Sequence, residues 1–274
     1  MGLKRRDFVK GVGITTLLGL GGLGGFWGLE EALNLKKAFG SSPGLPGNLR
    51  ESLPDPQALQ GKHWAIVIDL SKIQSVADLE PALQACRQAH NVPTIEDRKS
   101  EVKWIWTEDY EHTFPTQKNS LAAQSMERQA FPVLCNHCEN PPCVRVCPTQ
   151  ATYKRPDGIV AMDYHRCIGC RFCMAACPYG ARSFNFQDPR PFVKDPNPEF
   201  PLRTKGVVEK CNLCAERLDK GQQPICVEKS KGAILFGDLA DSNSEIRKLM
   251  EEHFMLQRKP ELGTGPNIYY MIRG

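Results

Sequence analysis

The spacing of the cysteines constrains this chain more than any other feature. Eleven of the twelve cysteines lie between residues 135 and 226, in two complete runs and one incomplete run. The complete runs read C-x2-C-x4-C-x3-C-P and C-x2-C-x2-C-x3-C-P, and the incomplete run reads C-x2-C-x11-C-x3-S. Their positions, in chain order, are Cys135, Cys138, Cys143 and Cys147, then Cys167, Cys170, Cys173 and Cys177, then Cys211, Cys214, Cys226 and Ser230. The fold must therefore be organised around whatever these cysteines bind.

Three kinds of cysteine chemistry compete for this pattern. Disulfides occur in exported proteins, but four cysteines within eleven residues, followed by proline, make a poor crosslinking framework. Zinc takes four thiolates in a tetrahedral site, and C-x2-C pairs alone do not exclude it. The C-x2-C-x2-C-x3-C-P run is the bacterial ferredoxin signature, in which three close cysteines hold one [4Fe–4S] cluster and the fourth ligates the other cluster. Two such runs in tandem favour iron–sulfur chemistry.

The crossing of the fourth cysteine predicts which thiolates share a cluster. The first site takes three cysteines of the first run and the last of the second: Cys135, Cys138, Cys143 and Cys177. The second site takes the complementary set: Cys167, Cys170, Cys173 and Cys147. The third site takes the incomplete run and the one cysteine left in the chain: Cys211, Cys214, Cys226 and Cys86. All twelve cysteines are then ligands of three [4Fe–4S] clusters.

Ser230 indicates that a fourth cluster has been lost. The segment from Trp64 to Cys86 reads as a cysteine run without its first three cysteines, and these would have shared a cluster with a thiol at the Ser230 position. The distance from Ser230 to the next alanine is one residue shorter than the distance from the last cysteine of each complete run to its next alanine. Lys229 is therefore the alternative position for the lost ligand. The alternative for Cys86 is a buried apolar role, which would leave a three-ligand or [3Fe–4S] third site.

The N-terminus carries an export signal. Arg5 and Arg6 precede Phe8 and an uncharged stretch over residues 11–29, which resembles a twin-arginine signal; a Sec signal or a buried helix is the alternative. The stretch approaches the roughly 20 apolar residues of a membrane span. We expect an uncleaved anchor over 1–29, with the rest of the chain on the extracytoplasmic (periplasmic) face. A weak cleavage site at residues 38–40 is the competing interpretation.

The remaining chain divides into three parts. Residues 30–61 are a linker, 62–240 a ferredoxin-like iron–sulfur domain, and 241–274 a C-terminal helix and tail. Within the tail we expect a helix over 242–257, with a capping box at Ser242, and an edge or partner-docking strand over 268–272. The fold class is α+β, with tandem bacterial-ferredoxin-like units of short β-hairpins and helices around the clusters. A net charge of +4 is too small to indicate nucleic acid.

Clusters with four protein thiolates keep no open position on iron, so we expect electron relay and no catalytic site on this chain. His137 is expected to donate a hydrogen bond to a cluster sulfur. Four arginines lie near the cysteines and would raise cluster potentials unless they are solvated: Arg145, Arg166, Arg171 and Arg182. Four apolar residues are expected to shield the clusters from water: Val144, Val146, Ile168 and Phe172.

These motifs carry a family resemblance. The segments CNHCENPPCVRVCPTQAT, CIGCRFCMAACPYGARSF and CNLCAERLDKGQQPICVE resemble the four-cluster ferredoxin subunits of membrane-bound oxidoreductases. The lost cluster, the twin-arginine start and segments such as KHWAIVID and RKPELGTGPNIYYMI narrow the resemblance to the DsrO family. These are extracytoplasmic iron–sulfur subunits of the DsrMKJOP complex of dissimilatory sulfur metabolism, including sulfate reduction.

The resemblance implies electron transport within a membrane complex. The implied partners are an NrfD-type membrane subunit (DsrP-like), a multihaem cytochrome c (DsrJ-like) and DsrM- and DsrK-like subunits, with the membrane reached through the N-terminal helix and no nucleic acid involved. One alternative is the iron–sulfur subunit of another exported oxidoreductase, with a molybdopterin or hydrogenase catalytic subunit. An alternative of another class is a zinc-stapled structural scaffold.

Overall fold

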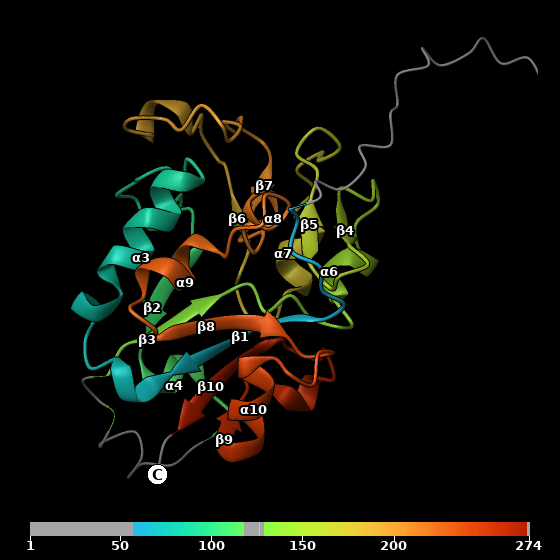
Figure 1. Cartoon of the computed structure of the whole chain (residues 1–274). Helices are drawn as coiled ribbons and strands as arrows, with labels where there is room; N and C mark the ends of the chain where they lie inside the picture. The colour runs from blue at the N-terminus through green and yellow to red at the C-terminus, as the bar shows by residue number, and fades with distance from the viewer. Residues whose placement is uncertain (1–56, 118–125, 127–128, 273–274) are drawn as a thin grey trace, which may run out of the picture. The chain divides into compact units, whose positions relative to one another are not determined.

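The computed structural model describes residues 57–117, 126 and 129–272 (Figure 1). The chain forms two units, Met1–Leu53 and Pro54–Gly274, and the description below concerns the second. The expected signal or anchor over residues 1–29 lies outside the described residues. Within the described part, no helix has the length and apolar character needed to cross a bilayer.

A four-stranded sheet brings together the beginning and the end of the described chain. Its order is β8 (Ile234–Asp238), β1 (Trp64–Asp69), β10 (Ile268–Ile272) and β9 (Phe254–Leu256). Strand β1 pairs antiparallel with β8 and parallel with β10. Every residue of β1 is buried, because one face of the strand packs into the main core and the other contacts the second cluster of apolar side chains beneath α10 (Glu245–Glu252). A strand covered on both faces has no polar alternation in its sequence.

The C-terminal segment differs from the sequence prediction in two ways. The helix expected over 242–257 extends only from Glu245 to Glu252, because the next residues form β9 and pair with β10. Its N-cap is Ser244, whose side chain makes no capping bond, so the capping box expected at Ser242 is wrong. Strand β10 lies inside the sheet between β1 and β9, so the expected edge strand is also wrong.

Two helices connect the sheet to the cysteine-bearing part of the fold. Helix α3 (Val76–Ala89) starts with a capping box between Ser75 and Asp78 and buries Leu79, Ala82 and Cys86. It packs against α9 (Ile225–Lys229), which buries Cys226. Figure 1 shows the two helices side by side, on the opposite side of the sheet from α10.

The other cysteines lie among small two-stranded sheets and single-turn helices. The antiparallel pairs are β2 (Ile105–Glu108) with β3 (Phe131–Leu134), β4 (Thr152–Lys154) with β5 (Val160–Met162), and β6 (Ser183–Phe184) with β7 (Val208–Glu209), of which only β4 and β5 are joined by a short loop. The short helices are α4 (Tyr110–Thr113), α6 (Pro142–Arg145), α7 (Phe172–Ala176) and α8 (Ala215–Leu218), with 3-10 turns at Leu70–Lys72, Arg190–Phe192 and Pro260–Leu262. The mixed helix-and-strand architecture expected for the α+β fold is confirmed.

Candidate metal centres

The first site is a cavity whose wall contains four cysteines. The cysteines that line it are Cys135, Cys138, Cys143 and Cys177. They come from separate places: the end of β3, the loop after it, helix α6 and the end of α7. Three of them are buried and Cys177 is half-buried. The fold thus brings together the set that the crossing rule predicts, although their spacing along the chain reaches 42 residues between Cys135 and Cys177.

Each C-x2-C turn contains a residue in the left-handed backbone conformation. The residues between or beside the paired cysteines have positive φ: His137 at 41°, Leu213 at 57° and Gly169 at 70°. No residue with a side chain fits at position 169, because its Cβ would lie 2.3 Å from the carbonyl oxygen of Gly206. Non-glycine residues adopt this conformation at an energetic cost. The surroundings therefore hold each turn in this conformation.

The third site gathers Cys86 with the incomplete run. The Cys86 sulfur interacts electrostatically with Cys211 and Cys226, and Cys214 interacts with all three. Backbone N–H groups support the sulfurs: that of Leu213 donates to Cys211 Sγ and that of Ile225 to Cys214 Sγ, each at 3.4 Å.

Burial sets the protonation of these four thiols in the metal-free chain. All four are buried, and burial raises the pKa of Cys226 to about 11 and those of Cys86 and Cys214 well above the ordinary value. Thiols bind metal as thiolates, so a metal at this site has to displace their protons.

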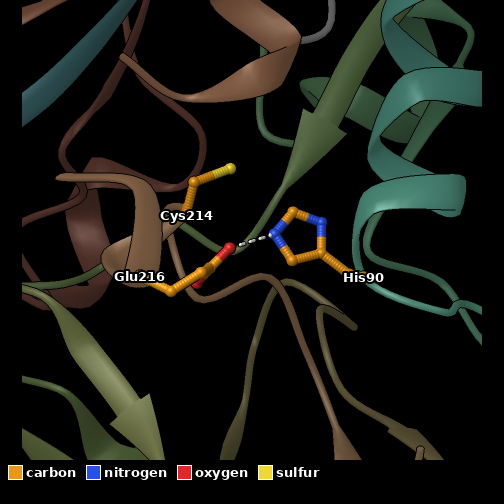
Figure 2. A group of neighbouring side chains, drawn as sticks. All are labelled: His90, Cys214 and Glu216. Atoms are coloured by element: carbon orange, nitrogen blue, oxygen red, sulfur yellow. Dashed lines mark hydrogen bonds and ion pairs between the residues drawn. The ribbon is translucent and has the colours of Figure 1, made fainter. Parts of the chain in front are cut away.

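His90 and Glu216 connect the elements of the third site (Figure 2). His90 Nε2 lies 2.8 Å from Glu216 Oε1, and its Nδ1 lies 2.9 Å from the carbonyl oxygen of Cys86. Burial opposes the charged form of Glu216, yet the hydrogen bonds from His90 and Asn212 hold its pKa below the ordinary value. The pair fixes the end of α3, which carries Cys86, against α8, which follows Cys214.

The same group could be mistaken for a separate metal site. Ligand atoms of His90, Cys214 and Glu216 lie within 4.8 Å of one another, and Figure 2 shows the thiol of Cys214 beside the His90–Glu216 pair. Both ring nitrogens of His90 already face oxygen atoms, so a metal bound there would break one of these bonds. The group belongs to the third site as its support.

The second site is more open than the other two. Cys173 is buried and interacts electrostatically with Cys167, and both belong to one apolar cluster. Cys147 follows α6, which packs against α7, the helix that carries Cys173. Cys170 is exposed. The structure therefore brings Cys167 and Cys173 together and leaves Cys170 at the surface.

Three apolar residues near these sites do not shield them. Ile168 is 67% exposed, Phe172 is 58% exposed and Val146 is 38% exposed, so the expected shielding by them is wrong. They lie on the solvent side of the turns that carry the cysteines. Val144 alone of the expected four packs inward, against the cluster that contains Cys143. An apolar surface next to the exposed Cys170 results.

Ser230, where the sequence predicts a lost cluster ligand, is buried next to the segment that lacks cysteines. Ser230 is 2% exposed whereas Lys229 is exposed, so the serine occupies the inward position after α9. Lys72 Nζ donates to the carbonyl oxygen of Gly232 at 3.1 Å, and the backbone N–H of Asp69 donates to that of Ala233 at 2.8 Å. The segment without its cysteine triplet therefore lies beside Ser230.

Two buried cations, Lys210 and Arg182, accompany the first site. Of the four arginines near the cysteines, Arg182 alone is buried; Arg145, Arg166 and Arg171 are exposed. Lys210, which sequence reasoning missed, is 1% exposed. Burial raises the pKa of a thiol, yet the charges of Lys210 and Arg182 hold the pKa of Cys135 well below its ordinary value. A single lysine before a C-x2-C pair gives no sequence signal of burial.

The donor set fits iron–sulfur clusters. Each cluster bound by four thiolates is an anion, and the buried cations at the first site lack carboxylate partners among the described residues. His137 adds a polar hydrogen: its Nδ1 accepts the backbone N–H of Val160 at 3.1 Å, which leaves the proton on Nε2. That buried Nε2 has no hydrogen-bond partner in the described part of the chain.

Comparisons with known proteins agree with this chemistry. Residues 126–190, which contain the first eight cysteines after Cys86, match the family model of the 4Fe-4S dicluster domain. The Hdr-like menaquinol oxidoreductase iron-sulfur subunit 1 of Archaeoglobus fulgidus is 42% identical over 81% of this chain and 88% of its own length. The menaquinone reductase iron-sulfur cluster-binding subunit of Nitratidesulfovibrio vulgaris is 34% identical over 77% of this chain and 89% of its own length.

A further relative matches a shorter part of the chain. The iron-sulfur subunit of the arsenate respiratory reductase of a Shewanella species is 37% identical over 59% of this chain and 79% of its own length. The expected 4Fe–4S chemistry is confirmed for the matched domain. The chain belongs to the family of 4Fe–4S electron-transfer subunits of oxidoreductase complexes that includes the iron-sulfur subunit 1 of the Hdr-like menaquinol oxidoreductase.

Proposed function

We propose that this chain holds three [4Fe–4S] clusters and relays electrons between a multihaem cytochrome c (DsrJ-like) and a quinone-reactive, NrfD-type membrane subunit (DsrP-like). The complex is of the DsrMKJOP type, with DsrM- and DsrK-like subunits. The relay lies on the extracytoplasmic face of the membrane. The twin-arginine sequence at residues 4–8 supports this location.

The position of Cys86 supports the cluster number. Its sulfur lies with Cys211, Cys214 and Cys226, so the incomplete run receives a fourth thiolate. The lost position is closed by Ser230, whose hydroxyl is engaged with backbone groups of Val227 and Ile234. Twelve cysteines therefore make three sets of four and leave no thiol over.

The cofactors supply single-electron acceptance and donation when bound. The chain's own residues hold, insulate and present them. The buried thiols of the first and third sites exclude water, and His90 and Glu216 keep α3 against α8. The second site, with Cys170, Ile168 and Phe172 exposed, offers the surface on which an electron-transfer partner docks.

The names of the relatives support a quinone-linked partner. Two of them are subunits of a menaquinol oxidoreductase and of a menaquinone reductase. The match to the iron-sulfur subunit of an arsenate respiratory reductase favours a second candidate. In that candidate the same relay serves another exported oxidoreductase and receives or delivers electrons at an adjacent catalytic subunit.

Purification of the intact complex tests the proposal. We expect about twelve irons and about twelve acid-labile sulfides per chain, together with haem and a polytopic membrane subunit. A catalytic molybdopterin subunit in place of the haem protein would decide for the second candidate. A colourless chain that contains zinc and gives no EPR signal on reduction would overturn both.

A further inference from the structure

Two buried cations lie among the cysteines without a carboxylate. Lys210 Nζ donates to the carbonyl oxygen of Cys211 at 2.7 Å and to that of Val160. Arg182 Nη1 donates to Thr152 Oγ1 at 3.1 Å, and its Nη2 has no hydrogen-bond partner among the described residues. No ion pair in the described part of the chain includes either residue. An unpaired charge in a protein interior costs several kcal/mol, so each cation needs an anion in the working molecule.

The neighbouring carboxylate does not supply that anion. Glu209 precedes Lys210, but strand alternation sends its side chain the other way. There it pairs with Arg203 at 2.7 Å and accepts hydrogen bonds from Trp104 and Asn185. Arg203 and Glu209 thus form a neutral buried pair, whereas no carboxylate among the described residues pairs with Lys210 or Arg182.

Each cation lies between two sites. Arg182 lines the cavity of the first site and its charge acts on Cys143 and Cys135 of that site and on Cys173 of the second. Lys210 acts on Cys135 of the first site and on Cys211 of the third. The first site therefore faces both cations, and the second and third sites face one each.

We propose that Arg182 and Lys210 give the first cluster the highest potential of the three and couple it electrostatically to its two neighbours. This inference rests on the proposed three-cluster relay. A cluster with four thiolates is anionic, and one-electron reduction makes it more so. A buried positive charge stabilises that extra electron because the interior screens it weakly.

The arrangement has a direct consequence for the relay. An electron that reaches the first site has left the second or the third, so one site is reduced as its neighbour is oxidised, with no bond made or broken. Arg182 and Lys210 favour the state in which the electron rests at the first site. They are positioning residues, because they act on potentials through charge and ligate no iron.

Redox titration of the purified full complex, followed by EPR, tests the inference. Arg182→Met should lower the potentials of the first and second clusters and leave the third unchanged. Lys210→Met should lower the first and third and leave the second unchanged. We expect at least a tenfold shift in each affected oxidised-to-reduced equilibrium, which is about 59 mV for one electron. The EPR signal that is lost in Cys170→Ala is assigned to the second cluster. The EPR signal that is lost in Cys86→Ala is assigned to the third cluster.

Three control variants make the result decisive. Arg166→Met removes an arginine next to Cys167 whose side chain is 65% exposed and paired with Asp163; it should leave all potentials unchanged. Arg182→Lys and Lys210→Arg keep the charge and should keep the potentials. Equal shifts at all three clusters, or none, would overturn the inference while the iron content still supported the relay.

Loss of clusters in the methionine variants would also be informative. If those variants lose iron but the charge-keeping variants retain it, the charge is required and the inference stands. If the charge-keeping variants lose iron as well, the side chains serve packing alone and the inference fails. Absence of clusters from the unaltered complex would instead overturn the proposed function.

Discussion

The backbone N–H of Ile234 donates to the hydroxyl oxygen of Ser230 at 3.0 Å. The same hydroxyl donates to the carbonyl oxygen of Val227 at 2.9 Å. These bonds close the turn between α9 and β8, at the place where each complete cysteine run carries its last thiol. Ser230, the predicted position of a lost ligand, thus belongs to a structural turn that ties α9 to the central sheet.

Ser230→Ala should destabilise the protein without changing its metal content. The substitution leaves the buried N–H of Ile234 without its acceptor, which costs about 1–3 kcal/mol. We expect a fall of several degrees in the thermal unfolding midpoint and unchanged iron per chain. Ser244→Ala is the matched control, because that serine makes no capping bond. A loss of iron in Ser230→Ala would show that the position still supports a cluster.

Cys86→Ala should remove or convert one cluster. The thiol lies among Cys211, Cys214 and Cys226, so its loss leaves three ligands at the third site. Iron analysis should show a loss of up to about a third of the iron, or EPR should show a [3Fe–4S] signal in place of one [4Fe–4S] signal. Full iron content with unchanged spectra would mean that Cys86 is an ordinary core residue and that the ligand assignment is wrong.

The proximity of the cysteines in the first and third sets could be predicted from the sequence, whereas their ligation of clusters stays a prediction. The grouping of Cys177 with Cys135 and of Cys86 with Cys211 followed from the crossing rule and from counting thiols. The choice between Ser230 and Lys229 needed the structure, since one missing residue after α9 leaves the alignment ambiguous. Their opposite exposure resolves which side chain faces inward.

The sequence pattern did not predict features that depend on contacts between distant parts of the chain. A run such as IYYMI at Ile268–Ile272 predicts a strand, but its place between β1 and β9 depends on tertiary pairing. The burial of Lys210 depends in the same way on its contact with Val160, 50 residues earlier. Ile168 and Phe172 were expected inside because they are apolar. The structure leaves both side chains exposed, and exposed apolar patches in soluble proteins often mark interaction surfaces.

Because Arg203 and Glu209 form a buried ion pair, removing the arginine alone should destabilise the protein much more than altering both residues. Both side chains are buried and their charged atoms are 2.7 Å apart. Arg203→Met should lower the free energy of unfolding by about 3–5 kcal/mol, because it leaves the Glu209 carboxylate buried without a cation. The double variant Arg203→Met with Glu209→Gln should recover much of that loss. Chemical denaturation under anaerobic conditions measures both, and equal stability of the single and double variants would contradict the argument.

Removal of iron should destabilise the unaltered chain more than a chain without the two buried cations. Once the clusters are gone, burial raises the pKa values of Cys138, Cys173, Cys177 and Cys211. Cys135, whose pKa the two cations hold well below its ordinary value, supplies at most one negative charge for two buried cations, so part of the counter-charge is lost. We expect oxidative chelation to lower the thermal unfolding midpoint. The fall should be smaller in Arg182→Met and Lys210→Met than in the unaltered chain or in Arg166→Met. Calorimetry of each variant before and after chelation gives the comparison. A fall of the same size in all four proteins would show that the cations do not depend on the clusters for their counter-charge.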